Sequence, residues 1–209
     1  MTTARNEHAG AVVDGKMFLF GGVCHDQSNA DADDVGCLSS MEVYDPSTDS
    51  WTAGPQMSVP RCLATAAAID GKIYVAGGCS FIENEYSTME CFDPSTNSWT
   101  EMPAMKAGRF GAVAAVIAGK MYVAGGYSHE HGGTVSSMEV YDPSTDSWTE
   151  GPEMDVAREY ALVAVVGGKM HVYGGRGLSS TSIYDPITNV WTRGPSLPAP
   201  LESGHAVVL

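Results

Sequence analysis

The residues best suited to hold a metal ion lie in the segment between Cys24 and Cys37. This segment concentrates one imidazole and four carboxylates, which belong to His25, Asp26, Asp31, Asp33 and Asp34. Carboxylate oxygens are typical calcium ligands, but the spacing of these aspartates matches no defined calcium-binding loop. We therefore interpret the segment as a solvated acidic loop.

A second candidate is the tripeptide His129-Glu130-His131, because imidazole is a typical zinc ligand. Adjacent residues cannot converge on one ion with a third ligand that the sequence does not supply, so we expect a polar loop tip here. The six histidines are scattered along the chain and form no catalytic constellation with other residues. We expect no catalytic residue, no bound metal and no cofactor.

Cysteine usage and charge indicate the compartment and the partners. Five cysteines leave at least one thiol unpaired, none lies in a CxxC motif, and the N-terminus lacks the apolar core of a signal peptide, so we expect a soluble cytoplasmic protein. Lysine and arginine total 11 against 25 aspartates and glutamates, which gives a formal net charge of −14. Nucleic acids and anionic membranes are poor partners for this charge. We interpret the charge as a solvated acidic surface, and selective attraction of a partner with basic residues is the alternative.

An internal repeat indicates the elements that position these residues. Glycine pairs, Asp-Pro pairs and single tryptophans recur in the same order along the chain. The glycine pairs are Gly21-Gly22, Gly77-Gly78, Gly125-Gly126 and Gly174-Gly175. The Asp-Pro pairs begin at Asp45, Asp93, Asp142 and Asp185, and the tryptophans are Trp51, Trp99, Trp148 and Trp191.

Each repeat predicts a four-stranded antiparallel sheet. In the second repeat, the apolar run 62–70 and residues 73–76 flank a two-residue turn and form a tight hairpin, and residues 88–92 and 99–102 supply two more strands. These strands are apolar on both faces, so the sheets must stack, with the tryptophans as anchors. We expect each glycine pair beneath a bulky ring, where the missing Cβ permits close approach and otherwise costly φ values, and we expect the Asp-Pro segments to be structural turns.

The order of arginine, apolar strand, Gly-Lys turn, Tyr-Val-Ala-Gly-Gly, Met-Glu-Val-Tyr-Asp-Pro and Trp-Thr resembles the kelch motif over essentially the whole chain. The resemblance implies an all-β propeller with blades of four antiparallel strands. It is closest to the kelch domains of BTB-Kelch adaptor proteins, which bind a substrate protein, although we find no BTB or BACK segment here. Kelch propellers also occur in galactose oxidase, sialic acid mutarotases and nitrile-specifier proteins, so an enzyme acting on a sugar or small molecule is the alternative function.

The number of repeats predicts an incomplete or associating ring. The repeats span approximately residues 5–60, 61–108, 109–157 and 158–200, and residues 201–209 begin a fifth repeat as an extra C-terminal strand. The resemblance implies about six blades in a closed ring, so four blades form an open arc. An open arc exposes apolar faces and strand edges, which favours self-association. A closed ring of four blades is the alternative.

The resemblance also implies that a protein or peptide partner binds to the loops after the glycine pairs and before the innermost strands. The matching residues are Tyr127, Ser128, His129, Arg176, Ser80, Phe81, His25, Arg61, Arg109, Arg158 and Tyr160. Tyr127 and Arg176 are the strongest candidates, because tyrosine and arginine are enriched at binding hot spots. The arginines 61, 109 and 158 recur in the repeats, which favours structural ion pairs or turn anchors. A recognition or scaffold module is the expected function, and a structural array without a partner is the third hypothesis.

Overall fold

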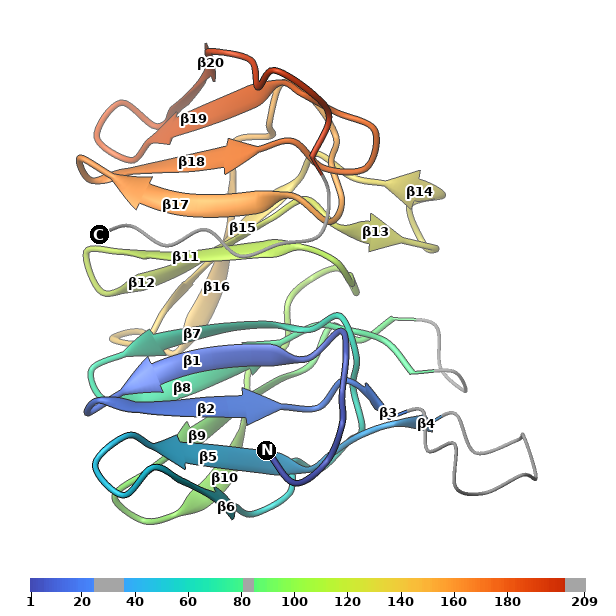
Figure 1. The fold of residues 1–209 in the computed structure, drawn as a ribbon. Coiled ribbons are helices and arrows are strands. Elements are labelled where there is room, and N and C mark those ends of the chain that lie inside the picture. The colour runs from blue at the N-terminus through green and yellow to red at the C-terminus, as the bar shows by residue number, and fades with distance from the viewer. Residues whose placement is uncertain (25–35, 81–84, 202–209) are drawn as a thin grey trace.

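The computed structural model describes residues 1–24, 36–80 and 85–201, and all regular elements in these ranges are β-strands. Four antiparallel sheets of four strands each follow one another along the chain (Figure 1). We call these sheets blades 1 to 4. They confirm the predicted all-β architecture of repeated four-stranded blades. No helix in the described ranges has the length and apolarity needed to cross a membrane.

The strands of each blade lie side by side in chain order. Blade 1 consists of β1 (Ala9–Val13), β2 (Lys16–Phe20), β5 (Met41–Asp45) and β6 (Ser50–Ala53). Blade 2 consists of β7 (Thr65–Ile69), β8 (Lys72–Ala76), β9 (Met89–Asp93) and β10 (Ser98–Met102). Blade 3 consists of β11 (Val113–Ile117), β12 (Lys120–Ala124), β15 (Met138–Asp142) and β16 (Ser147–Gly151). Blade 4 consists of β17 (Leu162–Val166), β18 (Lys169–Tyr173), β19 (Thr181–Asp185) and β20 (Val190–Gly194).

Two short ribbons interrupt this pattern. β3 (Val23–Cys24) pairs with β4 (Gly36–Cys37) in the first repeat, and β13 (Tyr127–Ser128) pairs with β14 (Gly133–Thr134) in the third. Both ribbons follow a glycine pair and lie outside the four-stranded sheets. Neither ribbon was predicted from the sequence.

The Asp-Pro segments are turns, as expected, and side chains stabilise them. In blade 2, Asp93 accepts hydrogen bonds from the Ser95 hydroxyl (2.6 Å) and the Ser95 amide (2.9 Å), and Lys72 Nζ lies 3.1 Å from its carboxylate. The Ser95 hydroxyl, followed by Lys72, lowers the pKa of Asp93 to about 2. The carboxylate therefore stays ionised and closes the turn between the two outer strands.

Apolar side chains interdigitate between neighbouring blades. The junction of blades 1 and 2 buries Phe18, Phe20 and Met41 against Ile73 and Val75. The next two junctions repeat this arrangement. Because each inner blade is apolar on both faces, it needs a neighbour on each side to bury its surface.

Each junction also contains a tryptophan that donates a hydrogen bond to the preceding blade. Trp99 Nε1 lies 2.9 Å from the Pro55 carbonyl oxygen, and Trp148 Nε1 lies 2.8 Å from that of Pro103. The indoles are partly buried. They thus anchor the junctions through this hydrogen bond as well as through packing.

The glycine pairs lie where the chain passes close to neighbouring backbone. Gly78 has a φ of 89°, and a Cβ added to it would lie 2.7 Å from the Cys62 carbonyl oxygen. Its amide donates to the Arg109 carbonyl of the next blade (2.9 Å). The close approach and the positive φ confirm why glycine is required here, but the neighbours are mainly backbone atoms and not the bulky ring that was expected from the sequence.

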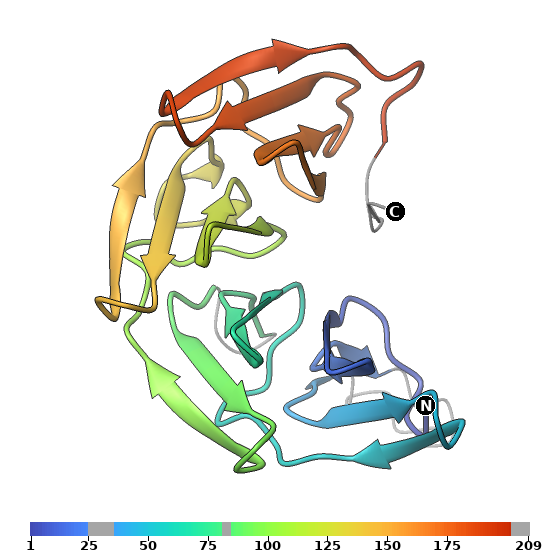
Figure 2. The ribbon, with the colours of Figure 1, turned by 90° about the vertical axis from the view of Figure 1, so that its left-hand side faces the viewer.

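The four blades form an open arc (Figure 2). Strand β1 packs on β7, β7 on β11, and β11 on β17, but in the described ranges β17 makes no contact with β1. This arrangement excludes the closed four-bladed ring. The predicted extra strand spans residues 201–209, and all of these residues except Leu201 lie outside the part of the chain that the structure describes.

Candidate binding surface

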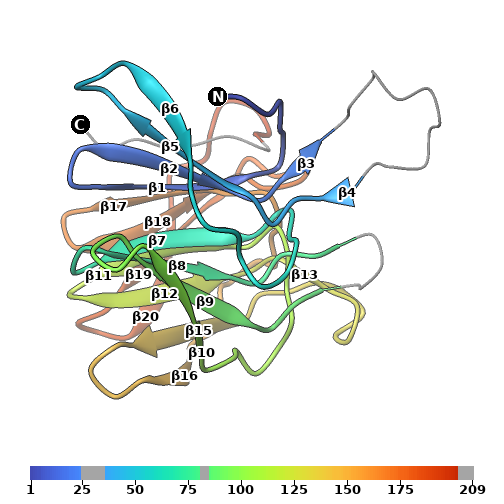
Figure 3. The ribbon, with the colours of Figure 1, turned by 90° about the horizontal axis from the view of Figure 1, so that it is seen from below.

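Loops gather along the edge of the arc where the innermost strands begin. The ribbons β3–β4 and β13–β14 both project from this edge (Figures 1 and 3). The tight turns and the Asp-Pro turns lie along the opposite edge (Figure 1). We call the first edge the loop face.

One backbone contact recurs on the loop face of every blade, between the residue after the repeated arginine and the residue after the glycine pair. In blade 2, Cys62 and Cys79 exchange two amide hydrogen bonds of 2.9 Å. Blades 1 and 3 have the same bridge, and in blade 4 one such bond of 3.0 Å is present. The paired residues are Asn6–Val23, Cys62–Cys79, Phe110–Tyr127 and Glu159–Arg176. A repeated frame that carries different side chains is typical of a recognition surface.

Blade 3 presents an aromatic cluster at its bridge. The rings of Phe110 and Tyr127 stack with centroids 5.3 Å apart, and the His129 ring lies 5.0 Å from that of Tyr127. Glu85 of blade 2 accepts a hydrogen bond from the His129 amide (2.7 Å) and lies 2.6 Å from His129 Nδ1. Burial raises the pKa of Glu85, but the hydrogen bonds from His129 and its neighbours outweigh burial and lower the pKa overall. An ionised Glu85 thus fixes His129 beside the aromatic rings.

Blade 4 presents a charged pair at the same position. Arg176 Nη1 lies 3.3 Å from Glu159 Oε1. The Arg176 side chain is 69% exposed, whereas that of Glu159 is 5% exposed. The guanidinium therefore has donors available for a partner while Glu159 holds it in place.

A belt of backbone hydrogen bonds joins the blades one residue beyond these bridges. The Leu63 amide donates to the Glu7 carbonyl (2.9 Å) and the Gly111 amide donates to the Leu63 carbonyl (3.0 Å). The Tyr160 amide then donates to the Gly111 carbonyl (2.9 Å). All four residues are left-handed, with φ between 53° and 61°. Three of them are not glycine, and each carries strain of about 1–3 kcal/mol that the belt helps to offset.

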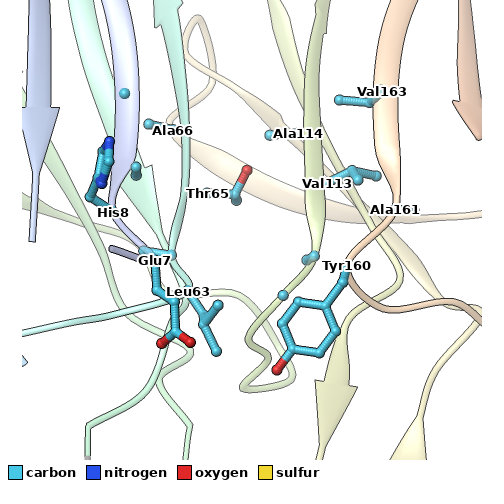
Figure 4. Close-up of a pocket in the computed structure, with 15 residues that line it drawn as sticks. Glu7, His8, Leu63, Thr65, Ala66, Val113, Ala114, Tyr160, Ala161 and Val163 are labelled. Atoms are coloured by element: carbon cyan, nitrogen blue, oxygen red, sulfur yellow. The ribbon is translucent and has the colours of Figure 1, made fainter. Parts of the chain in front are cut away.

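The belt lies at the mouth of a pocket on the inner side of the arc. The pocket has a volume of about 560 Å³ and is lined by the innermost strands, whose alanines leave this space. Glu7 and Tyr160 face each other across the mouth (Figure 4). Burial raises the pKa of Tyr160 to about 12, so its hydroxyl stays protonated at neutral pH. The pocket thus combines an apolar wall with a carboxylate and a hydroxyl.

The repeated arginines do not line this surface, which corrects their prediction as partner contacts. Arg61 Nη2 lies 2.8 Å from Glu90 Oε1, and the two side chains are 0% and 3% exposed. The same buried pair recurs as Arg5–Glu42 and Arg109–Glu139. In each of blades 1 to 3, the arginine connects the segment before the first strand to the third strand. The recurrence of these arginines had favoured such structural ion pairs.

Arg158 is also buried, but its partner differs. Its Nη2 donates to Ser182 Oγ (2.8 Å), and this hydroxyl lies 2.5 Å from the Asp155 carboxylate. Ser182 occupies the position that glutamate holds in the other blades. Asp155 therefore supplies the negative charge from the segment that precedes the arginine.

The remaining predicted contacts have different placements. Ser128 is 0% exposed and its hydroxyl lies 3.2 Å from Glu85, so its prediction as a partner contact is wrong. Ser80 is partly buried next to the bridge of blade 2, on the loop face. His25 and Phe81 lie outside the described residues.

The metal sites considered from the sequence are not assembled in the described ranges. These ranges contain no group of three or more His, Cys, Asp or Glu side chains placed to hold a metal ion. The aspartates of the insertion between Cys24 and Cys37 lie outside these ranges. The absence of a cofactor stays a prediction.

Comparison with known proteins places the repeats in a family. The Kelch motif matches residues 4–58, 60–106, 108–155 and 157–198. Kelch-like protein 15 of Danio rerio is 40% identical over 81 residues, which are 39% of this chain and 13% of that protein. Kelch repeat and BTB domain-containing protein 12 of Homo sapiens is 39% identical over 74 residues, which are 32% of this chain and 12% of that protein. The matches thus span only a small part of the length of these relatives.

A solved structure shares the fold. The structure of YjhT superimposes with a TM-score of 0.77 at 22% sequence identity, and the similarity covers 96% of this chain and 68% of that chain. Nearly the whole arc therefore corresponds to part of a longer chain.

Proposed function

The chain belongs to the kelch family, and from this premise we propose that it is a protein-interaction module whose loop face recognises a protein or peptide. Kelch repeats commonly mediate protein–protein interaction, which supports the proposal. The single observation that carries it is the recurring bridge, whose backbone repeats while its side chains change from blade to blade. The cytoplasm stays the compartment that we expect.

We infer that the partner presents a basic residue next to an apolar one. Glu7 at the mouth of the pocket and the net charge of −14 favour a lysine or arginine on the partner. The pocket wall and the Phe110–Tyr127 stack favour an apolar or aromatic neighbour. Arg176 has donors for carbonyl groups of the partner backbone.

Selection from a random peptide library displayed on phage tests this proposal. We expect the selected peptides to be rich in lysine and arginine and to lose about 30-fold in affinity for Tyr127→Ala, as expected of a hot-spot residue. Glu7→Gln is expected to weaken binding less and to reduce its dependence on salt, because it removes one charge at the mouth.

The matched control is Ile187→Ala, which removes an apolar side chain that is 93% exposed in a turn of the opposite edge. Binding to this variant is expected to equal binding to the unmodified chain. Peptides that bind Tyr127→Ala as tightly as Ile187→Ala would show that the loop face is not the binding surface.

We further propose that the two ends of the arc bind each other in a second copy of the chain. We call the side of a blade that packs on the preceding blade its start face, and the side that packs on the following blade its end face. On the start face of blade 1, Met17 is 36% exposed. Its counterparts in the other blades are 0% exposed; they are Ile73, Met121 and Met170.

The end face of blade 4 shows the complementary pattern. Val166 is 44% exposed, whereas its counterparts are at most 8% exposed; they are Val13, Ile69 and Ile117. The same two kinds of face already pack together at the three junctions inside the chain. A second copy that packs its start face on this end face would continue an interface that the chain itself uses.

A further inference from the structure

Three cysteine thiols meet at the loop face, where blades 1 and 2 join. Cys62 Sγ lies 2.7 Å from Cys37 Sγ and 3.6 Å from Cys79 Sγ. Cys37 ends β4 of the first repeat, and the other two form the bridge of blade 2. Of the five cysteines, Cys91 belongs to the core between blades 2 and 3, and Cys24 lies in β3 opposite Gly36.

The backbone holds the closest two thiols together. The Arg61 amide donates to the Leu38 carbonyl (3.1 Å), so the residues next to Cys62 and Cys37 are hydrogen-bonded to each other. A disulfide has a sulfur–sulfur length of about 2.05 Å. The two sulfur atoms need to approach by only about 0.7 Å from their separation of 2.7 Å to reach it.

We propose that Cys37 and Cys62 form a reversible disulfide when the protein meets a small-molecule disulfide such as oxidised glutathione. Cys37 is partly exposed and Cys62 is buried, so within this pair the reagent reaches Cys37 before Cys62. The Cys37 thiolate attacks one sulfur of the reagent and expels the other as a thiolate. Cys62 then attacks Cys37 Sγ and expels the second thiolate.

The exchange is balanced in atoms and electrons. The sulfur–sulfur bond of the reagent breaks and one protein disulfide forms, so two protein thiols are oxidised while two reagent sulfurs are reduced. The protons of both cysteine thiols pass to the two thiolates that leave. Cys79 stays a thiol, because its sulfur is farther from Cys62.

The disulfide would crosslink two blades at the proposed binding surface. It would join the β3–β4 ribbon to the bridge of blade 2 and so restrict movement of this ribbon over the loop face. An effect on partner binding rests on the proposed function, whereas formation of the disulfide does not.

Peptide mapping of the purified chain tests the proposal. The chain is treated with oxidised glutathione, alkylated and digested with trypsin without reduction. Cleavage after lysine and arginine places Cys37, Cys62 and Cys79 in separate peptides, which span residues 17–61, 62–72 and 73–106. We expect peptide 17–61 linked to peptide 62–72, and a fall from five alkylated cysteines to three that dithiothreitol reverses. A link between 62–72 and 73–106, or no link, would overturn the proposal.

Two matched variants identify the cysteine in peptide 17–61. Cys24→Ser is expected to keep the link and Cys37→Ser to abolish it; both side chains are partly exposed, so both variants should fold. The opposite result would sink the assignment. Binding of the selected peptides, compared before and after oxidation, reports on the proposed function separately, because the peptide map does not depend on any partner.

Discussion

Glu42 shows what one buried carboxylate contributes to the arc. It accepts hydrogen bonds from the amides of Thr2 (2.6 Å) and Thr3 (3.0 Å) and pairs with Arg5 at 2.9 Å. Burial raises the pKa of Glu42, but these bonds outweigh it and lower the pKa from 4.5 to about 2. Because the folded pKa is the lower one, this stabilisation is present above about pH 4.5 and is lost as the pH falls towards 2.

Glu42→Gln is therefore expected to lower the free energy of unfolding by about 3 kcal/mol near pH 7, and to flatten its fall between about pH 5 and 2. Urea denaturation at a series of pH values measures both effects. Glu101→Gln removes the same charge from an exposed position on β10 and serves as the control. Equal losses in the two variants near pH 7 would contradict a special role for the buried pair.

At the level of residues, the sequence revealed the loop-face residues that follow a glycine pair and differ between repeats. It did not reveal the residues that pair with them across each bridge. Tyr127 and Arg176 follow a glycine pair and differ from their counterparts, and the structure places both on the loop face. Phe110 and Glu159 were missed because each lies 17 residues before its bridge partner, and only the fold joins them. Aligning the residue after each repeated arginine would have revealed the same variation.

At the level of elements, substitution of a paired glycine tests how the backbone joins neighbouring blades. Gly126 has a φ of 95°, and an added Cβ would lie 2.8 Å from the Phe110 carbonyl oxygen. Its amide also donates to the Arg158 carbonyl of blade 4 (2.9 Å). Any side chain here strains the backbone and pushes on a hydrogen-bonded junction.

We expect Gly126→Ala to lower the free energy of unfolding by about 3 kcal/mol. Gly36→Ala in β4 is the control, because an added Cβ meets nothing within 4 Å there, and we expect it to be neutral within about 0.5 kcal/mol. Thermal and urea unfolding of both variants measure these changes in the free energy of unfolding. A stable Gly126→Ala protein would mean that this backbone can relax at little cost.

Strands and turns were predictable because their signals are local. Turn residues and apolar runs lie within a few positions of one another in each repeat. Residues 73–76 and 99–102 were therefore placed correctly in β8 and β10. The ribbons β3–β4 and β13–β14 were not predicted, since each has only two residues per strand and little pattern. The bulky ring expected next to each glycine pair was wrong, because the close neighbours are mainly backbone atoms from segments that are distant in sequence, whereas the close approach and the unusual φ values were predicted correctly.

For the whole molecule, the repeat count correctly predicted the open arc, and the exposed ends make self-association testable. Met17→Glu should disable the start face of blade 1 and Val166→Glu the end face of blade 4, so each variant alone is expected to stay monomeric in sedimentation experiments across a concentration series. An equimolar mixture should form heterodimers, because each variant keeps one intact face. Ile187 lies on a turn whose counterparts are exposed in every blade, so the control Ile187→Glu should associate like the unmodified chain.

Salt separates this association from recognition of a basic partner. Two copies that each carry a charge of −14 repel one another, so added salt should strengthen self-association. The same salt should weaken binding of a basic peptide. An unmodified chain that stays monomeric at every concentration and salt level would refute the proposed interface.

The belt through Glu7, Leu63, Gly111 and Tyr160 is made of main-chain amides and carbonyls alone. Replacing most side chains around the pocket mouth therefore leaves these links between blades intact. Such a molecule can acquire a new ligand by point mutation without first losing its shape. Evolution and protein engineering can thus vary specificity and architecture separately in this chain.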